Sequence, residues 1–166
     1  MAKKSAKKPG RYWLLKSEAD CYSIEKLEGE QGQTTFWDGV RNYQARNFIR
    51  DDMQVGDRAF FYHSNAKPMT IAGTVEITKS GYPDPTAFDK TEQHYDPKSD
   101  PDNPTWYVVD VTLLQKFPEP VTREQLKERA ELSDMMLLQR GSRLSVQPVT
   151  EKEWKFIHRL AGVKDV

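Results

Sequence analysis

Apolar residues fall into short runs along this chain of 166 residues, separated by polar and glycine-containing breaks. Residues 12–16 are apolar up to a final lysine, which predicts a short strand in the interior of a sheet. Residues 58–64 carry large side chains on both faces and predict a second strand. Residues 106–114 alternate apolar with polar positions and predict a half-buried strand.

A further strand is expected over residues 70–77, with Ile71, Val75 and Ile77 on one side. Gly73 lies on that same side, where a missing side chain marks a close approach of neighbouring groups or a β-bulge. We therefore expect the strand to pack closely, or to bulge, at this glycine.

Capping residues predict several short helices, because a side-chain oxygen at an N-cap accepts a hydrogen bond from the first unpaired amides. In the last of these helices, Trp154, Ile157 and Leu160 form the apolar stripe. The expected caps are Ser23, Thr122 and Thr150, the last in a capping box with Glu153.

The fold class follows from these elements and from the segment that interrupts them. Residues 81–104 contain five prolines and predict an excursion with one helical turn near residues 86–88. Several strands, only short helices and no βαβ spacing predict an α+β domain built on a small curved or closed sheet. We expect this single domain over residues 11–163, after a disordered basic tail over residues 1–10.

The segment of residues 37–50 carries the strongest sign of function. Trp37 stands before a turn at Gly39, and Asp38 or the turn itself is expected to cap a helix whose arginines face solvent. Exposed amides, guanidinium groups and a π face can together hold a phosphate and an unstacked base. The alternative is a core tryptophan followed by a solvated basic face. The arginines of this segment are Arg41, Arg46 and Arg50.

Charge and composition limit the partners. The net charge is zero, but residues 1–11 carry five positive charges and no acid, which leaves a formal charge of −5 on the remainder. The body is therefore no general polyanion binder and would contact nucleic acid through a local patch. No apolar run approaches the roughly 20 residues of a membrane span, and the single cysteine, Cys21, leaves no disulfide or zinc cluster. We expect a cytoplasmic protein, or a nuclear one in a eukaryote.

Catalytic and metal-binding patterns are few. His63, His94 and His158 have no metal spacing, and no glycine loop or serine elbow is present. The acidic residues between 96 and 103 suggest a calcium loop, but prolines interrupt the pattern, so a solvated acidic loop is the other interpretation. We expect no metal, no cofactor and no membrane contact.

Polar and aromatic side chains instead recur at predicted strand ends and turns. If these segments meet, they form a cleft with a stacking wall and a cationic rim, which fits one base extruded from a strand. Residues 137–143 add two arginines around a glycine turn; their other interpretation is a helix C-terminus with favourable basic residues.

Six segments of the chain closely resemble the EVE domain family: residues 12–18, 37–48, 61–65, 82–88, 95–101 and 136–149. The resemblance extends from about residue 12 to the last helix. It implies a PUA-like β-barrel with surrounding helices, related to YTH readers of methylated adenosine and to domains that flip methylated cytosine. Those relatives bind modified bases and are not catalysts.

The resemblance also implies roles for individual residues. It places Lys16 and Ser17 beside a flipped base and makes Trp37 the stacking wall. Ala19 departs from the proline that the family often has after Ser-Glu, and this freer loop would alter the pocket edge. The further pocket residues are Asn42, Tyr62, His63, Ser64 and Leu138, and the phosphate contacts are Arg41, Arg46, Arg140 and Arg143.

The sequence thus predicts a non-enzymatic reader whose partner is DNA or RNA carrying a modified base. Two alternatives remain open: an enzyme that acts on a nucleotide or nucleoside in the same cleft, and a protein-interaction module that uses residues 81–104.

Overall fold

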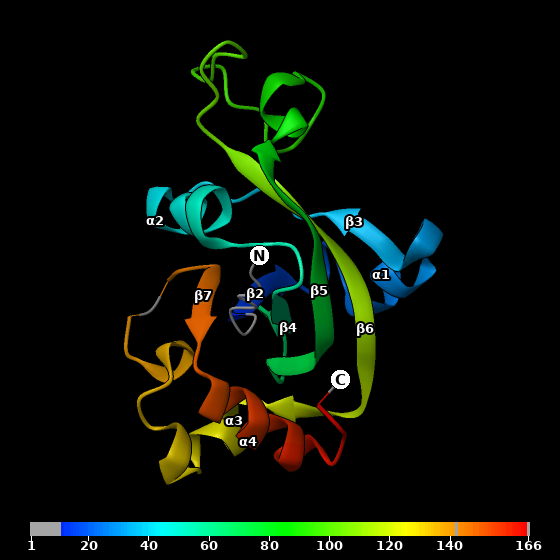
Figure 1. The fold of residues 1–166 in the computed structure, drawn as a ribbon, viewed down its shortest axis with the longest axis vertical. Helices are drawn as coiled ribbons and strands as arrows, with labels where there is room; N and C mark the ends of the chain where they lie inside the picture. Colours follow the sequence, from blue (N-terminus) through cyan, green and yellow to red (C-terminus); the bar gives the residue numbers. More distant parts are fainter. Residues whose placement is uncertain (1–10, 142, 166) are drawn as a thin grey trace, which may run out of the picture.

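Six strands form one mixed sheet in the computed structural model, which describes residues 11–141 and 143–165 (Figure 1). The basic tail expected over residues 1–10 lies outside the described residues. β2 runs parallel to β4, and every other neighbouring pair is antiparallel. In sheet order the strands are β3 (Thr34–Phe36), β6 (Tyr107–Thr122), β5 (Thr70–Pro83), β4 (Arg58–Ser64), β2 (Tyr12–Glu18) and β7 (Val146–Val149).

Short helices surround this sheet. α3 and α4 lie at the end away from the excursion into which β5 and β6 continue (Figure 1). No helix within the described residues is long and apolar enough to span a bilayer. The helices are α1 (Ile24–Gly29), α2 (Tyr43–Asn47) with a π turn (Phe48–Asp52), α3 (Arg123–Lys127) and α4 (Glu151–Ala161). Short 3₁₀ turns occupy Gln31–Gln33, Pro85–Phe88, Ala130–Leu132 and Met136–Leu138.

The predicted α+β class is confirmed, in its curved form. Within the described residues β3 and β7 are the two edges of the sheet, which is therefore not closed into a barrel. Side chains alternate between two apolar clusters because successive residues of a strand point to opposite faces. Trp13 and Phe61 belong to the first cluster, and Phe60 and Trp154 belong to the second.

A β-bulge corrects one prediction for β5. Phe61 pairs with Gly73 and Tyr62 pairs with Ile71, so Ala72 is an extra residue in the ladder. Ile71 therefore faces the second cluster, whereas Val75 faces the first, although the sequence predicts a common side. The close approach expected at Gly73 is confirmed, because a Cβ there would lie 2.6 Å from Ile24 Cδ1.

The expected caps at Ser23, Thr122 and Thr150 are all present, the last two in capping boxes. The helix after Trp37 is the exception, since it begins only at Tyr43. The Asn42 side chain caps it by accepting a hydrogen bond from the Ala45 amide at 3.0 Å. Residues 37–41 are thereby left as a non-helical turn.

Candidate functional site

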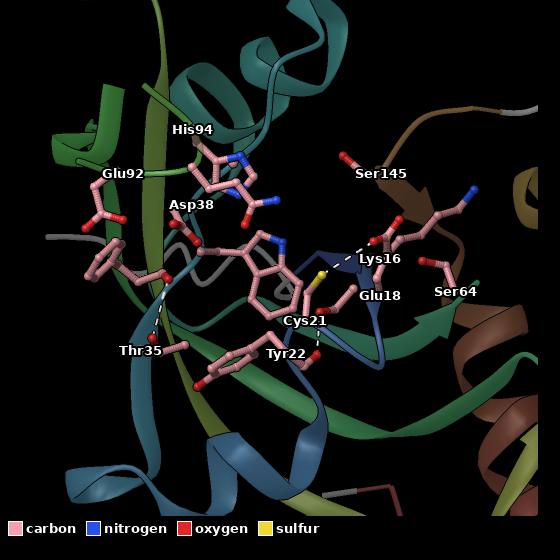
Figure 2. A pocket seen from close by; sticks show the side chains of 15 residues that line it. Lys16, Glu18, Cys21, Tyr22, Thr35, Asp38, Ser64, Glu92, His94 and Ser145 are labelled. Atoms are coloured by element: carbon pink, nitrogen blue, oxygen red, sulfur yellow. Dashed lines mark hydrogen bonds between the residues drawn. The ribbon is translucent and has the colours of Figure 1, made fainter. Parts of the chain in front are cut away.

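A cavity of about 670 Å³ lies where β2 and β4 end side by side (Figure 2). The parallel pairing of the two strands sets Glu18 opposite Ser64 at this edge. The segment that follows β3 forms the wall across from them. Figure 2 shows Lys16, Glu18 and Ser64 on one side of the cavity and Asp38, Glu92 and His94 on the other.

Trp37 belongs to both the core and the cavity wall. Its backbone amide continues the β3 ladder by donating to the Val109 carbonyl at 2.8 Å. The residue is 6% exposed, and its ring meets Phe61 edge-on at 5.3 Å and Tyr22 at 6.5 Å. The ring is thus part of the core, and only a small part of the residue is exposed where it borders the cavity.

The indole nitrogen of Trp37 differs from those of the other three tryptophans. Within the described residues it donates to no acceptor, and it is not enclosed away from solvent. The other three indole N–H groups donate to aspartates: Trp13 to Asp57 at 3.0 Å, Trp106 to Asp96 at 2.7 Å and Trp154 to Asp165 at 2.6 Å.

The buried carboxylate of Asp84 holds the turn that follows Trp37. It accepts hydrogen bonds from Arg41 Nη1 at 2.9 Å and from the Gly39 amide at 3.3 Å. Arg41 Nη2 in turn donates to the His94 carbonyl at 2.6 Å. Gly39 has φ of 79°, and a Cβ there would lie 2.6 Å from His94 Nε2, so glycine is needed at this position.

The cavity wall carries more negative than positive charge. Lys16 shares the lining with three carboxylates, those of Glu18, Asp38 and Glu92. Burial raises the pKa of Asp38, and the nearby charge of Asp84 raises it further, against His94 and Arg41. Burial and the neighbouring Arg123 lower the pKa of Lys16. Such a wall favours a ligand that presents hydrogen-bond donors over an anion.

Four of the eight predicted pocket residues, Lys16, Ser17, Trp37 and Ser64, line this cavity. The other four do not. Tyr62 and Leu138 pack in or against the second apolar cluster, and Asn42 caps α2. His63 Nε2 accepts a hydrogen bond from the Ile24 amide at 3.1 Å, and burial lowers the pKa of His63.

The four arginines predicted to contact phosphates divide into two pairs. Arg41 is held by Asp84, and Arg46 Nη1 donates to the Thr105 carbonyl at 2.8 Å, so both are half-buried and engaged within the protein rather than free in solvent. Arg140 and Arg143 are exposed on either side of Gly141. They lie close in sequence to Ser145, which lines the cavity.

Sequence reasoning missed several cavity residues. Asp38 is adjacent to the turn glycine, and this position was a usable signal. Glu92 and His94 lie in the proline-rich excursion, where no periodicity marks them. In the described part of the chain, no group of three His, Cys, Asp or Glu side chains is placed to hold a metal ion. Asp96 of the considered calcium loop accepts the Trp106 indole hydrogen bond.

Comparison with known proteins places the chain among proteins of the same fold. The EVE domain model matches residues 11–160. Human thymocyte nuclear protein 1 is 44% identical over 163 residues, covering 88% of this chain and 72% of the relative. A Pseudomonas putida crystal structure is 48% identical with a TM-score of 0.84 and covers 90% of this chain and 99% of its own.

A further solved structure shows a related protein with a ligand. It is human THYN1 in complex with DNA that contains 5-methylcytosine. It is 42% identical to this chain with a TM-score of 0.88, and the alignment covers 94% of this chain and 100% of the human one.

Proposed function

The chain belongs to the EVE domain family, and from this premise we propose that it binds a modified base, flipped from a DNA or RNA strand into the cavity beside Trp37. The observation that carries the proposal is the cavity itself, whose volume of about 670 Å³ lies within the range of small-molecule sites. The human relative crystallised with 5-methylcytosine DNA supports the same class of partner.

In this proposal the base contacts come from side chains that line the cavity. Trp37 offers part of a ring, and Lys16, Ser17 and Ser64 offer polar groups on the opposite side. Phosphates would stay outside because the wall is rich in carboxylates. The proposed backbone contacts are therefore the exposed Arg140 and Arg143.

The remaining predicted residues support the site from behind. Tyr62 and Leu138 pack with the second apolar cluster beneath the strand ends. Asn42 caps α2 at the point where the turn ends. Arg41 and Arg46 fasten the turn and α2 to the excursion. The excursion thus contributes to the cavity wall, which favours this role over a separate protein-docking surface.

We further propose that binding occurs without turnover. A general base needs a free nitrogen, but His63 Nε2 already accepts the Ile24 amide. The Cys21 thiol has a raised pKa, chiefly because it is hydrogen-bonded to Glu18, so it is not an activated nucleophile. Cytoplasmic or nuclear location stays a prediction, although the human relative is named as a nuclear protein.

Fluorescence anisotropy with labelled oligonucleotides tests the proposal. Each sequence would carry either 5-methylcytosine or cytosine at one position, at one stated salt concentration, in single-stranded and duplex form. We expect tighter binding to the modified strand. Flipping a base costs a few kcal/mol, and only a base that fits the cavity well makes enough contacts to offset that cost. Equal affinity for both strands would refute selective binding of this base. Mass spectrometry of digested nucleosides after long incubation should show the base unchanged.

A further inference from the structure

The cavity presents one hydrogen-bond donor without a partner among the described residues and one carboxylate that no other described residue engages. The Trp37 indole N–H has no acceptor among the described residues. The Asp38 carboxylate is joined by hydrogen bond or ion pair to no other described residue; its own backbone amide is its donor. Both residues line the cavity and are consecutive in the chain.

The backbone that carries these two groups is held in position before any ligand arrives. The Trp37 amide is fixed to β6, and the amide of Gly39 is fixed to Asp84. Asp38 therefore lies between two anchored residues. A preorganised donor and acceptor select a ligand edge with little loss of conformational entropy.

We propose that Trp37 and Asp38 read the amino edge of the flipped base, so that the protein selects a 4-aminopyrimidine over a 4-oxopyrimidine. The inference rests on the proposed function, since it assigns the chemistry of the same cavity. In cytosine an exocyclic amino group lies next to an unprotonated ring nitrogen. The amino group donates to the Asp38 carboxylate, and the ring nitrogen accepts the Trp37 indole N–H.

A 4-oxopyrimidine reverses both positions of this edge. Its oxygen would face the Asp38 carboxylate, and its ring N–H would face the indole N–H, so neither pair could form. The half-buried carboxylate of Asp38 then loses its water without gaining a hydrogen-bond donor. This loss costs more free energy than the unpaired indole N–H does. Burial beside Asp84 already raises the pKa of Asp38, so a donor on the ligand relieves an existing electrostatic strain.

Thymine and 5-methylcytosine form the sharpest pair of probes, because they share the methyl group and differ only in this edge. Four otherwise identical single strands would carry 5-methylcytosine, thymine, cytosine or uracil at one position. We expect wild-type protein to bind the 5-methylcytosine strand about tenfold or more tightly than the thymine strand. Equal binding of these two would overturn the inference.

Asp38→Asn tests the acceptor directly. An amide can turn its NH₂ toward the thymine oxygen, so the preference should fall to within about threefold. Asp102→Asn is the matched control, because it removes the same charge from an exposed position outside the cavity. Asp102→Asn should keep the wild-type preference for the 5-methylcytosine strand over the thymine strand. An unchanged preference in Asp38→Asn would overturn the inference.

A ligand-side measurement needs no folded variant. A strand with a doubly methylated exocyclic amine on 5-methylcytosine lacks the donor, so wild-type protein should bind it as weakly as thymine. Undiminished affinity for that strand would also overturn the inference. The comparison of 5-methylcytosine with cytosine is separate and reports on the proposed function: selectivity for the methyl group can survive while the assignment of Asp38 fails.

Discussion

Trp37 and Trp154 lie in apolar clusters on opposite faces of one sheet, and both rings are almost fully buried. Trp154 lies against Phe60, with ring centroids 4.3 Å apart, and its N–H donates to Asp165 at 2.6 Å. Trp37 meets its neighbours edge-on and borders a cavity with its N–H unpaired among the described residues. The two tryptophans are thus both buried, and they differ in whether the indole N–H has an acceptor among the described residues and in whether the residue borders the cavity.

Removing the packed ring should have the largest effect. Trp154→Ala is expected to lower the free energy of unfolding by about 3–5 kcal/mol, because it leaves a large cavity and removes the hydrogen bond to Asp165. Urea denaturation measures the loss. The folded fraction should still bind the modified strand with wild-type affinity. A loss of affinity in the folded fraction would contradict the assignment of Trp154 to packing alone.

Removing the ring that borders the cavity should act mainly on binding. Trp37→Ala is expected to weaken binding of the modified strand by about 1–3 kcal/mol through the lost contact with the base. Its stability should fall by less than that of Trp154→Ala, since the Trp37 N–H donates no hydrogen bond within the described residues that the substitution would remove, whereas the Trp154 N–H donates to Asp165. Parallel anisotropy and urea titrations give both numbers. Trp37→Phe sharpens the result, because it keeps a smaller aromatic ring while it removes the N–H.

The arginines allow the same comparison between side chains that have a partner within the protein and side chains that are exposed. Replacing Arg140 and Arg143 by glutamine should weaken modified and unmodified strands alike. The salt dependence of binding should become shallower by about one unit of slope per lost phosphate contact. Arg41→Gln should instead lower stability, because it leaves Asp84 buried without its cation. Affinity measured at several salt concentrations separates the two classes. Selective loss of the modified strand alone would show that Arg140 and Arg143 read the base.

The smallest effect concerns a paired tryptophan in acid. The Trp106 N–H, followed by the Lys98 amide, lowers the pKa of Asp96 below its ordinary 3.8. A carboxyl with a lowered folded pKa stabilises the fold above its unfolded pKa, and this contribution is lost as the pH falls below about 3.8 toward the folded value. Asp96→Asn should therefore lose less stability than wild type across that window. Thermal unfolding between about pH 4 and about pH 2, where this contribution is lost, measures the difference.

The sequence predicts the local elements of this fold better than their spatial relations. Strand patterns and the caps at Thr122 and Thr150 depend on near neighbours, so they can be read from the chain. The side of Ile71 could not be predicted, because it depends on a bulge that forms only against β4. The extent of β5 and β6 likewise depends on their mutual pairing.

In the candidate site, too, local features could be predicted from the sequence and long-range contacts could not. Lys16, Ser17, Trp37 and Ser64 were predictable because they end strands or flank a turn. The internal pairing of Arg41 was not, since its partner Asp84 is 43 residues away in the sequence. Arginine on a polar segment looks exposed until the buried carboxylate that binds it is known.

The Asp84 clamp has a kinetic consequence. It joins residues 43 positions apart, and the bond from Arg41 to the His94 carbonyl spans 53 positions. Closing such long loops is entropically unfavourable and contributes little to an early nucleus, which favours local contacts. The binding cavity is therefore expected to mature after the strands have paired. In a refolding experiment, the capacity to bind a modified strand should appear later than the far-ultraviolet signal of the sheet.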